Sequence, residues 1–205
     1  TILFVFGLKG LSSPKTALRG NTSAMAGMGL AIVATLIHPD VKEYTWLGAA
    51  LILGLVIGAT VAKKINMKAM PELVAALHSF VGLAAVLVAA GTFIIYRDSG
   101  SLNSVLLIEI GLGSIIGAIT FTGSVVAFGK LQGSFGSNPV VFKGQHFVNL
   151  LVALATLGLC AYYVVNPEMN VFILFTVLSL LLGVLIVIPI GGADMPVIVS
   201  MLNSY

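Results

Sequence analysis

The chain alternates between long apolar stretches and short polar connections. Eight apolar segments are separated by charged or turn-forming residues: 1–8, 22–37, 45–62, 71–95, 104–129, 147–165, 171–188 and 196–205. Six of them approach the roughly 20 residues that an α-helix needs to cross a bilayer, whereas the first and the last are too short. We therefore expect a piece of a larger membrane protein whose first and last spans are truncated.

The length of these segments favours helices over strands. A membrane β-barrel is built from alternating strands of about ten residues, and these segments are longer and do not alternate. A helix also satisfies its backbone hydrogen bonds internally, as the bilayer interior requires. The pattern predicts an all-α, polytopic transmembrane helical bundle of about eight helices, forming one domain over residues 1–205.

The composition supports a lipid environment. Of the 205 residues, 59% are hydrophobic and only 8% are charged, whereas about a quarter of a soluble domain is charged. This shortage of charge excludes a soluble domain, a disordered chain and a nucleic-acid binder. Cys160 is the only cysteine, so an internal disulfide is excluded and redox chemistry is not expected.

The ten Lys and Arg residues indicate an orientation. If the segments cross the membrane in turn, the loops 9–21, 63–70, 130–146 and 189–195 share one side and carry eight basic residues. The loops 38–44, 96–103 and 166–170 share the other side and carry only two, Lys42 and Arg97. Because cytoplasmic loops carry the excess of basic residues, we expect the first side to be cytoplasmic.

Three polar side chains from three different segments fall at a similar depth. His78 and Asn203 each lie seven residues after a proline at the inner start of a helix, which is about 10 Å along the helix axis. Ser124 precedes Lys130 by six residues, which places it about 9 Å from the same side. The three residues are therefore candidates for one polar layer.

The chemistry of this layer suits proton transfer. Imidazole changes its charge nearest to neutral pH, so a histidine inside a membrane can accept and donate protons. Asparagine and serine can hydrogen-bond either form of the ring or hold a water beside it. A neutral structural histidine, with Asn203 and Ser124 as hydrogen bonds between helices, is the alternative that the residues alone leave open.

Two carboxylates have a functional and a structural interpretation. Glu109 lies near the outer end of its segment, where it is either an outer proton relay or an interfacial group that reaches the lipid headgroups. Asp194 lies two residues before Pro196 and is well placed to cap the helix that follows. It could also pair with a cation of the basic inner surface and respond to a docked partner.

Two glycine pairs with GxxxG spacing lie inside apolar segments, namely Gly54 with Gly58 and Gly113 with Gly117. This spacing predicts close packing between helices. The glycines around Gly113 are also faintly similar to a dinucleotide-binding fingerprint. That interpretation is rejected, because the spacing is wrong by one residue and no strand precedes it.

Three stretches resemble the beta subunit of the proton-translocating nicotinamide nucleotide transhydrogenase family. They read PELV followed by HSFVGLAAVLV in residues 71–88, FTGSVVAFGKL in residues 121–131, and GGADMP with SMLNSY in residues 191–205. The resemblance extends in order over the whole chain. It implies a bacterial inner-membrane enzyme in which hydride passes from NADH to NADP⁺, driven by inward proton movement.

The resemblance also implies roles for particular residues. It assigns His78, Ser124, Asn203 and Glu109 to the proton channel, and Asp194 to the coupling with the NADP(H)-binding domain. It places NAD(H) and NADP(H) in other domains, so this chain is expected to hold no cofactor, catalytic hydride site or metal. The implied partners are the alpha subunit, the NADP(H)-binding domain, a second copy of the whole enzyme and the lipid membrane.

Two other classes of protein remain as alternatives. A stand-alone secondary transporter or ion channel would be expected to show internal repeats and broken helices in corresponding halves, and the sequence shows no self-similar halves. A structural membrane protein without proton chemistry would surround His78 with packed side chains. The contacts around His78 therefore distinguish these alternatives.

Overall fold

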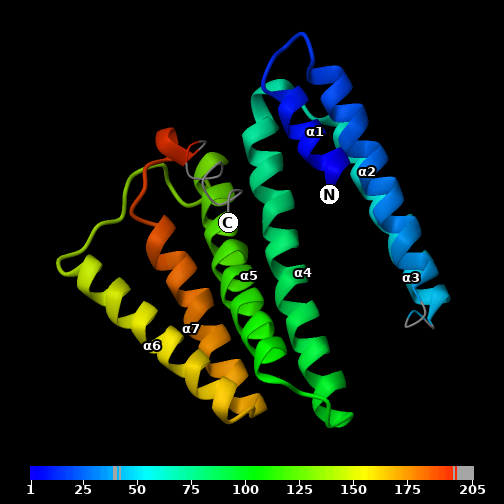
Figure 1. The fold of residues 1–205 in the computed structure, drawn as a ribbon. Helices are drawn as coiled ribbons and strands as arrows, with labels where there is room; N and C mark the ends of the chain where they lie inside the picture. The colour runs from blue at the N-terminus through cyan, green and yellow to red at the C-terminus, as the bar shows by residue number, and fades with distance from the viewer. Residues whose placement is uncertain (39–40, 42, 196, 198–205) are drawn as a thin grey trace. The chain divides into compact units, whose positions relative to one another are not determined.

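The computed structural model describes residues 1–38, 41, 43–195 and 197, and within these residues the regular secondary structure is helical (Figure 1). The chain divides into two compact units, residues 1–64 and residues 65–205. The prediction of an all-α polytopic membrane bundle is confirmed. The prediction that residues 1–205 form a single domain stays a prediction.

Six helices in the described part of the chain are long and apolar enough to cross a membrane. Each coincides with one of the six long segments of the sequence. They are α2 (Ala17–Ile37), α3 (Tyr44–Lys64), α4 (Met70–Asp98, preceded by the 3-10 turn η1, Met67–Ala69), α5 (Ser104–Leu131), α6 (Gln145–Val165) and α7 (Met169–Val187). The first apolar segment forms the shorter helix α1 (Ile2–Leu11), and the eighth lies almost entirely outside the described residues.

In the first unit, α1 and α2 pack through glycine. A Cβ atom built on Gly10 would lie 2.5 Å from the Gly20 Cα, so only glycine permits this approach of the two backbones. The third helix of the unit differs, because none of the α3 residues is buried. The first unit therefore has one tight helix pair and one helix whose surface is open.

In the second unit, α5 is the central helix. It contacts α4, α6 and α7, and Figure 1 shows it between α4 and α7. Its buried residues are spread around the helix rather than along one stripe. The helix begins after Asn103, whose side-chain oxygen accepts a hydrogen bond of 2.8 Å from the Leu106 N–H and so caps the first turn.

The α4–α5 interface is built from small residues. A Cβ on Gly82 of α4 would lie 2.5 Å from the Phe121 nitrogen of α5, and one on Gly117 would lie 2.8 Å from the Gly82 carbonyl oxygen. The two backbones thus meet directly, since neither glycine has a side chain to separate them. The predicted close packing is confirmed for Gly117.

For the other glycines of the two GxxxG pairs, the predicted close packing is not found within their units. In the described residues of their units, a Cβ on Gly54, Gly58 or Gly113 would meet no atom within 4 Å. The spacing sets which glycines share a helix face, but the crossing point of the neighbouring helix decides which of them is covered. On α5 that crossing point lies at Gly117, opposite Gly82.

Candidate functional site

His78 lies on α4, beside the buried face of that helix. Ala75, Ser79 and Gly82 are buried, and the His78 side chain between them is partly buried. Pro71 lies in the first turn, where proline has no helical hydrogen bond to lose, and Glu72 lies in the same turn at the positive end of the helix. The imidazole is thus held within a membrane-length helix, at the edge of its contact with α5.

The packing of α4 on α5 places His78 level with Ser124. The two helices are antiparallel (Figure 1), with Gly82 against Phe121 at one level. Toward the start of α4 and the end of α5, Ala75 and Val126 belong to the same buried cluster. His78 lies between Ala75 and Gly82 on α4, and Ser124 lies between Phe121 and Val126 on α5. The two residues therefore lie at one level of the unit, as their depths in the sequence predict.

Ser124 itself is almost completely buried, with 1% of its surface exposed. A hydroxyl at this depth cannot be hydrated by bulk water, so it is available only to groups of the bundle interior. Asn203, the third member of the predicted layer, lies outside the described residues. The structure thus brings two of the three predicted polar residues to one level.

Glu109 does not belong to this layer. It lies on the second turn of α5, with an exposed side chain. Fifteen residues separate it from Ser124 along the same helix, which is about 22 Å. Direct contact between this carboxylate and the His78 layer is therefore excluded by distance.

Asp194 lies at the inner end of the second unit. It is the last residue of the short 3-10 turn η2 (Gly192–Asp194), and its side chain is exposed. The next residue, Met195, is fully buried in the cluster that contains Ala75 and Val126. The segment after α7 thus packs against the bundle through Met195, while the Asp194 side chain is exposed. The helix that Asp194 was expected to cap lies outside the described residues.

Lys130 is the residue whose position differs most from expectation. The sequence pattern assigned it to the inner loop 130–146, but it lies in the last turn of α5 and only 1% of its surface is exposed. Its ammonium group donates three hydrogen bonds to backbone carbonyl oxygens, of Asn138 at 3.1 Å, Ile188 at 2.6 Å and Ile190 at 2.8 Å. The Lys130 ammonium therefore points into the protein. It can do so because the end of α7 leaves carbonyl groups without helical partners.

A signal for this arrangement exists in the sequence. A lysine in the last turn of a helix can bind carbonyl groups that the helix end leaves open. Lys130 comes directly after the apolar run of α5 and is followed by a glycine-containing loop. The charge pattern alone uses Lys130 as a marker of membrane orientation and does not reveal this structural role.

The half of the second unit that contains the end of α4 and the start of α7 is closed by aromatic packing. Phe93 of α4, Tyr163 of α6 and two phenylalanines of α7, Phe172 and Phe175, form one cluster with ring centroids 5.2 to 5.9 Å apart. Just beneath it, the Ser114 and Thr176 hydroxyls form a hydrogen bond of 2.9 Å between α5 and α7. This half of the unit is therefore tightly packed.

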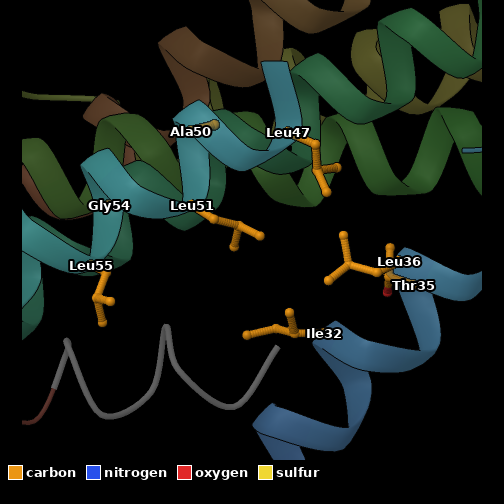
Figure 2. A pocket seen from close by; sticks show the side chains of 8 residues that line it. All are labelled: Ile32, Thr35, Leu36, Leu47, Ala50, Leu51, Gly54 and Leu55. Atoms are coloured by element: carbon orange, nitrogen blue, oxygen red, sulfur yellow. The ribbon is translucent and has the colours of Figure 1, made fainter. Parts of the chain in front are cut away.

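The first unit contains an apolar groove of about 490 Å³ between α2 and α3. Figure 2 shows Ile32 and Leu36 of α2 and Leu47 and Leu51 of α3 around the same space. Among the described lining residues, the hydroxyl group on Thr35 donates a hydrogen bond of 2.9 Å to the carbonyl of its own helix at residue 31. None of the described lining residues is titratable, so they offer no proton acceptor.

Metal chemistry has no support in the described residues. Among them, no three histidine, cysteine, aspartate or glutamate side chains come together in a group that could hold a metal ion. The buried polar side chains of the second unit include the hydroxyls of Ser114, Ser124 and Thr176 and the ammonium group of Lys130.

The helices define a polytopic membrane protein of the helical-bundle class. The chain matches the family model of the NAD(P) transhydrogenase beta subunit over residues 1–205. Two sequences of NAD(P) transhydrogenase subunit beta from Rhodospirillum rubrum are each 44% identical over 209 aligned residues, covering 100% of this chain and 45% of the relative. The chain therefore belongs to the NAD(P) transhydrogenase beta subunit family and represents a membrane part of it. It spans about half of the length of these relatives.

Proposed function

We propose that the chain is the proton-translocating membrane domain of an NAD(P) transhydrogenase. Inward proton movement through this domain drives hydride transfer from NADH to NADP⁺ in other domains of the enzyme. The observation that carries the proposal is the position of His78, a titratable side chain on a membrane-length helix, level with the buried Ser124. Ionisable residues at membrane depth mark ion pathways. The resemblance to proton-translocating transhydrogenases supports a proton as the translocated ion.

In this proposal His78 accepts and releases the translocated proton. Protonation adds a second N–H donor and a positive charge to the ring. Because α4 and α5 meet through their backbones at Gly82 and Gly117, a change at the ring alters how one helix lies on the other. Asn203 is the proposed hydrogen-bonding partner of the ring, together with Ser124.

Coupling requires that the two protonation states of His78 favour two different arrangements of the inner surface. Asp194 lies on that surface with an exposed carboxylate, so we assign it to the contact with the NADP(H)-binding domain. Glu109 is assigned to the outer end of the same proton path. The alpha subunit, which carries the NAD(H) domain, and a second copy of the enzyme complete the proposed assembly.

The experiment replaces His78 by alanine in the complete enzyme, reconstituted in membrane vesicles. His146→Ala is the matched control, since His146 is an exposed histidine in the first turn of α6. A lost proton acceptor is expected to lower the proton-driven hydride transfer rate by about 100-fold or more. The control is expected to keep the rate. Full coupled turnover of His78→Ala would contradict the proposal and favour a purely structural histidine.

The proposed membrane is the bacterial cytoplasmic membrane, with the lysine-rich loops in the cytoplasm. The distribution of eight basic residues against two supports this orientation. In it, Asp194 and the end of α7 face the cytoplasm, where soluble nucleotides are available. Protons that move inward would then leave the channel on the side of the nucleotide-binding domains.

A further inference from the structure

The carbonyl groups that surround Lys130 come from two separate parts of the chain. Asn138 belongs to the loop between α5 and α6, and both Ile188 and Ile190 follow the end of α7 at Val187. The ammonium group has three N–H donors, and each has a carbonyl acceptor within 3.1 Å. Lys130 thus joins the end of α5 to both segments at one point.

Charge explains why the contact is specific. A buried cation is unfavourable unless hydrogen bonds replace its lost hydration. The carbonyl groups at the end of α7 carry the negative end of the helix dipole, so they stabilise a cation better than isolated carbonyls would. The three convergent acceptors suit a compact ammonium group, whereas the planar fork of an arginine would not place its donors in this way.

Two backbone hydrogen bonds reinforce the same point. The Gly192 N–H donates to the Ser137 carbonyl at 2.9 Å, and the Val140 N–H donates to the Ile188 carbonyl at 3.2 Å. The Lys130 ammonium and these two bonds fix the loop 132–144 against the segment 188–192. We name this arrangement the inner joint; it consists of Lys130, Ser137, Asn138, Val140, Ile188, Ile190 and Gly192.

The inner joint lies between the two groups that the proposed function must connect. On its outer side, α5 carries Ser124 six residues before Lys130. On its other side, the chain continues from Gly192 directly to the exposed Asp194 and to Met195. Met195 is buried in one cluster with Ala75, which lies three residues before His78 on α4. The inner joint therefore lies between Ser124 on α5 and Asp194 on the segment after α7.

We propose that Lys130 is a positioning residue for coupling, which holds the segment with Asp194 in register with α4 and α5. A shift of these helices when His78 changes protonation is then passed to Asp194 through a rigid contact. Without the ammonium, the segment 188–195 would not follow the helices and would have the same position in both protonation states of His78. This inference rests on the proposed function and adds the part that transmits the signal.

The first test replaces Lys130 by glutamine in the complete enzyme in vesicles. Lys143→Gln is the matched control, since Lys143 lies in the loop that follows α5 and has an exposed side chain. Stimulation of hydride transfer by an imposed proton gradient is expected to fall about tenfold in the Lys130 variant, a typical size for a coupling effect. The rate without a gradient and the amount of assembled enzyme are expected to change little. A proportional fall of both rates would overturn the proposal in favour of a merely structural lysine.

A second variant pair avoids the risk that a buried lysine is needed for folding. A Cβ on Gly192 would lie 3.1 Å from the Ser137 Cβ and 3.4 Å from the Lys130 carbonyl oxygen, which forces the inner joint to shift slightly. A Cβ on Gly191 would have no contact below 3.6 Å. Gly192→Ala is therefore expected to weaken gradient stimulation, and Gly191→Ala to retain it. Equal stimulation in both variants would contradict the proposal.

A third measurement follows the inner joint without enzyme activity. Ala193 is exposed and the native Cys160 of this chain is buried, so Ala193→Cys adds a reactive thiol at this segment, and the enzyme without the substitution gives the background labelling. Adding Lys130→Gln is expected to raise its labelling rate by a water-soluble maleimide, whereas adding Lys143→Gln is not. Unchanged labelling would mean that Lys130 does not hold this segment. If His78→Ala keeps full coupling, the proposed function fails; if only the Lys130 variant keeps it, this inference alone fails.

Discussion

At the scale of single residues, the helix packing of the second unit depends on glycines, which have no side chain to separate two backbones. Gly82 and Gly117 let α4 and α5 touch through their backbones, and this contact places His78 and Ser124 at the same level of the unit. Inside a bilayer, burial of apolar surface does not favour one helix neighbour over lipid. Close packing at glycine therefore contributes much of the attraction between these two helices.

Replacing Gly117 by alanine tests this contact. The added Cβ would lie 2.8 Å from the Gly82 carbonyl and 2.9 Å from the Ala85 Cβ, so the helices must separate. We expect a loss of about 1–3 kcal/mol in the free energy of unfolding, as in other overpacked interiors. Denaturation of the purified protein in detergent measures the loss. Gly113→Ala is the control, because its Cβ would meet no described atom within 4 Å; equal losses in both variants would refute the assignment.

Residue chemistry explains which parts of the site the sequence could predict. His78 and Ser124 were predictable because a polar group in an apolar segment stands out, and a rise of 1.5 Å per residue converts sequence distance into depth. The inner joint was not predictable, because its acceptors are backbone carbonyls, which every residue has. Only the chain path after α7 brings those carbonyls to Lys130.

At the scale of elements, α5 and α7 are joined by polar contacts. The Ser114 hydroxyl bonds Thr176, and the Thr122 hydroxyl donates to the Leu180 carbonyl at 2.7 Å. Gly183 of α7 lies against the backbone of α5, where a Cβ would come within 2.6 Å of the Ile119 carbonyl oxygen. This interface combines hydrogen bonds with a close approach, so we expect α5 and α7 to move together.

A double-mutant cycle on Ser114→Ala and Thr176→Val measures this polar contact. The coupling energy between the two changes is expected to be about 0.6 kcal/mol, the average for hydrogen bonds between membrane helices. Thr156→Val is the matched control on α6, because the Thr156 hydroxyl bonds only the Val152 carbonyl of its own helix. Combined with Ser114→Ala it should show no coupling. A coupling energy of zero for Ser114 and Thr176 would mean that the hydrogen bond adds nothing to the α5–α7 interface.

The elements themselves were largely readable from the sequence, and their contacts were not. Charged and turn-forming residues end each apolar run, so the predicted spans and the observed helices differ by only a few residues, as for 104–129 against Ser104–Leu131. Which glycines are covered depends on crossing points that spacing does not determine. Gly54 and Gly117 have the same local pattern, and only the second meets a neighbouring helix.

At the scale of the whole molecule, the connections between helices determine the orientation in the membrane. The inner joint binds the loop 132–144 to the segment after α7, so these two connections lie on the same side. This agrees with the alternation of sides that the sequence predicts. Of the basic residues assigned to that side, Lys130 is buried, so the solvent-facing positive charge there is smaller than the sequence suggests.

Cysteine labelling in intact cells tests the orientation. Ser101 in the connection before α5 and Ser134 in the connection after it are both exposed. A membrane-impermeant maleimide is expected to label Ser101→Cys in intact cells, and Ser134→Cys only after the membrane is opened, because the lysine-rich side should be cytoplasmic. The chain without either substitution provides the background, since Cys160 is buried. The reverse labelling pattern would invert the proposed orientation.

The inner joint also has a consequence for biosynthesis. Lys130 and its acceptor Ile188 are separated by 58 residues. Throughout the synthesis of those residues, the ammonium group lacks two of its three carbonyl acceptors, Ile188 and Ile190, so water must hydrate it. A nascent chain that stops before Ile188 should therefore keep the end of α5 accessible to water-soluble reagents. We expect this end of the bundle to close only once α7 is inserted, which makes it one of the last parts of the unit to acquire its native contacts.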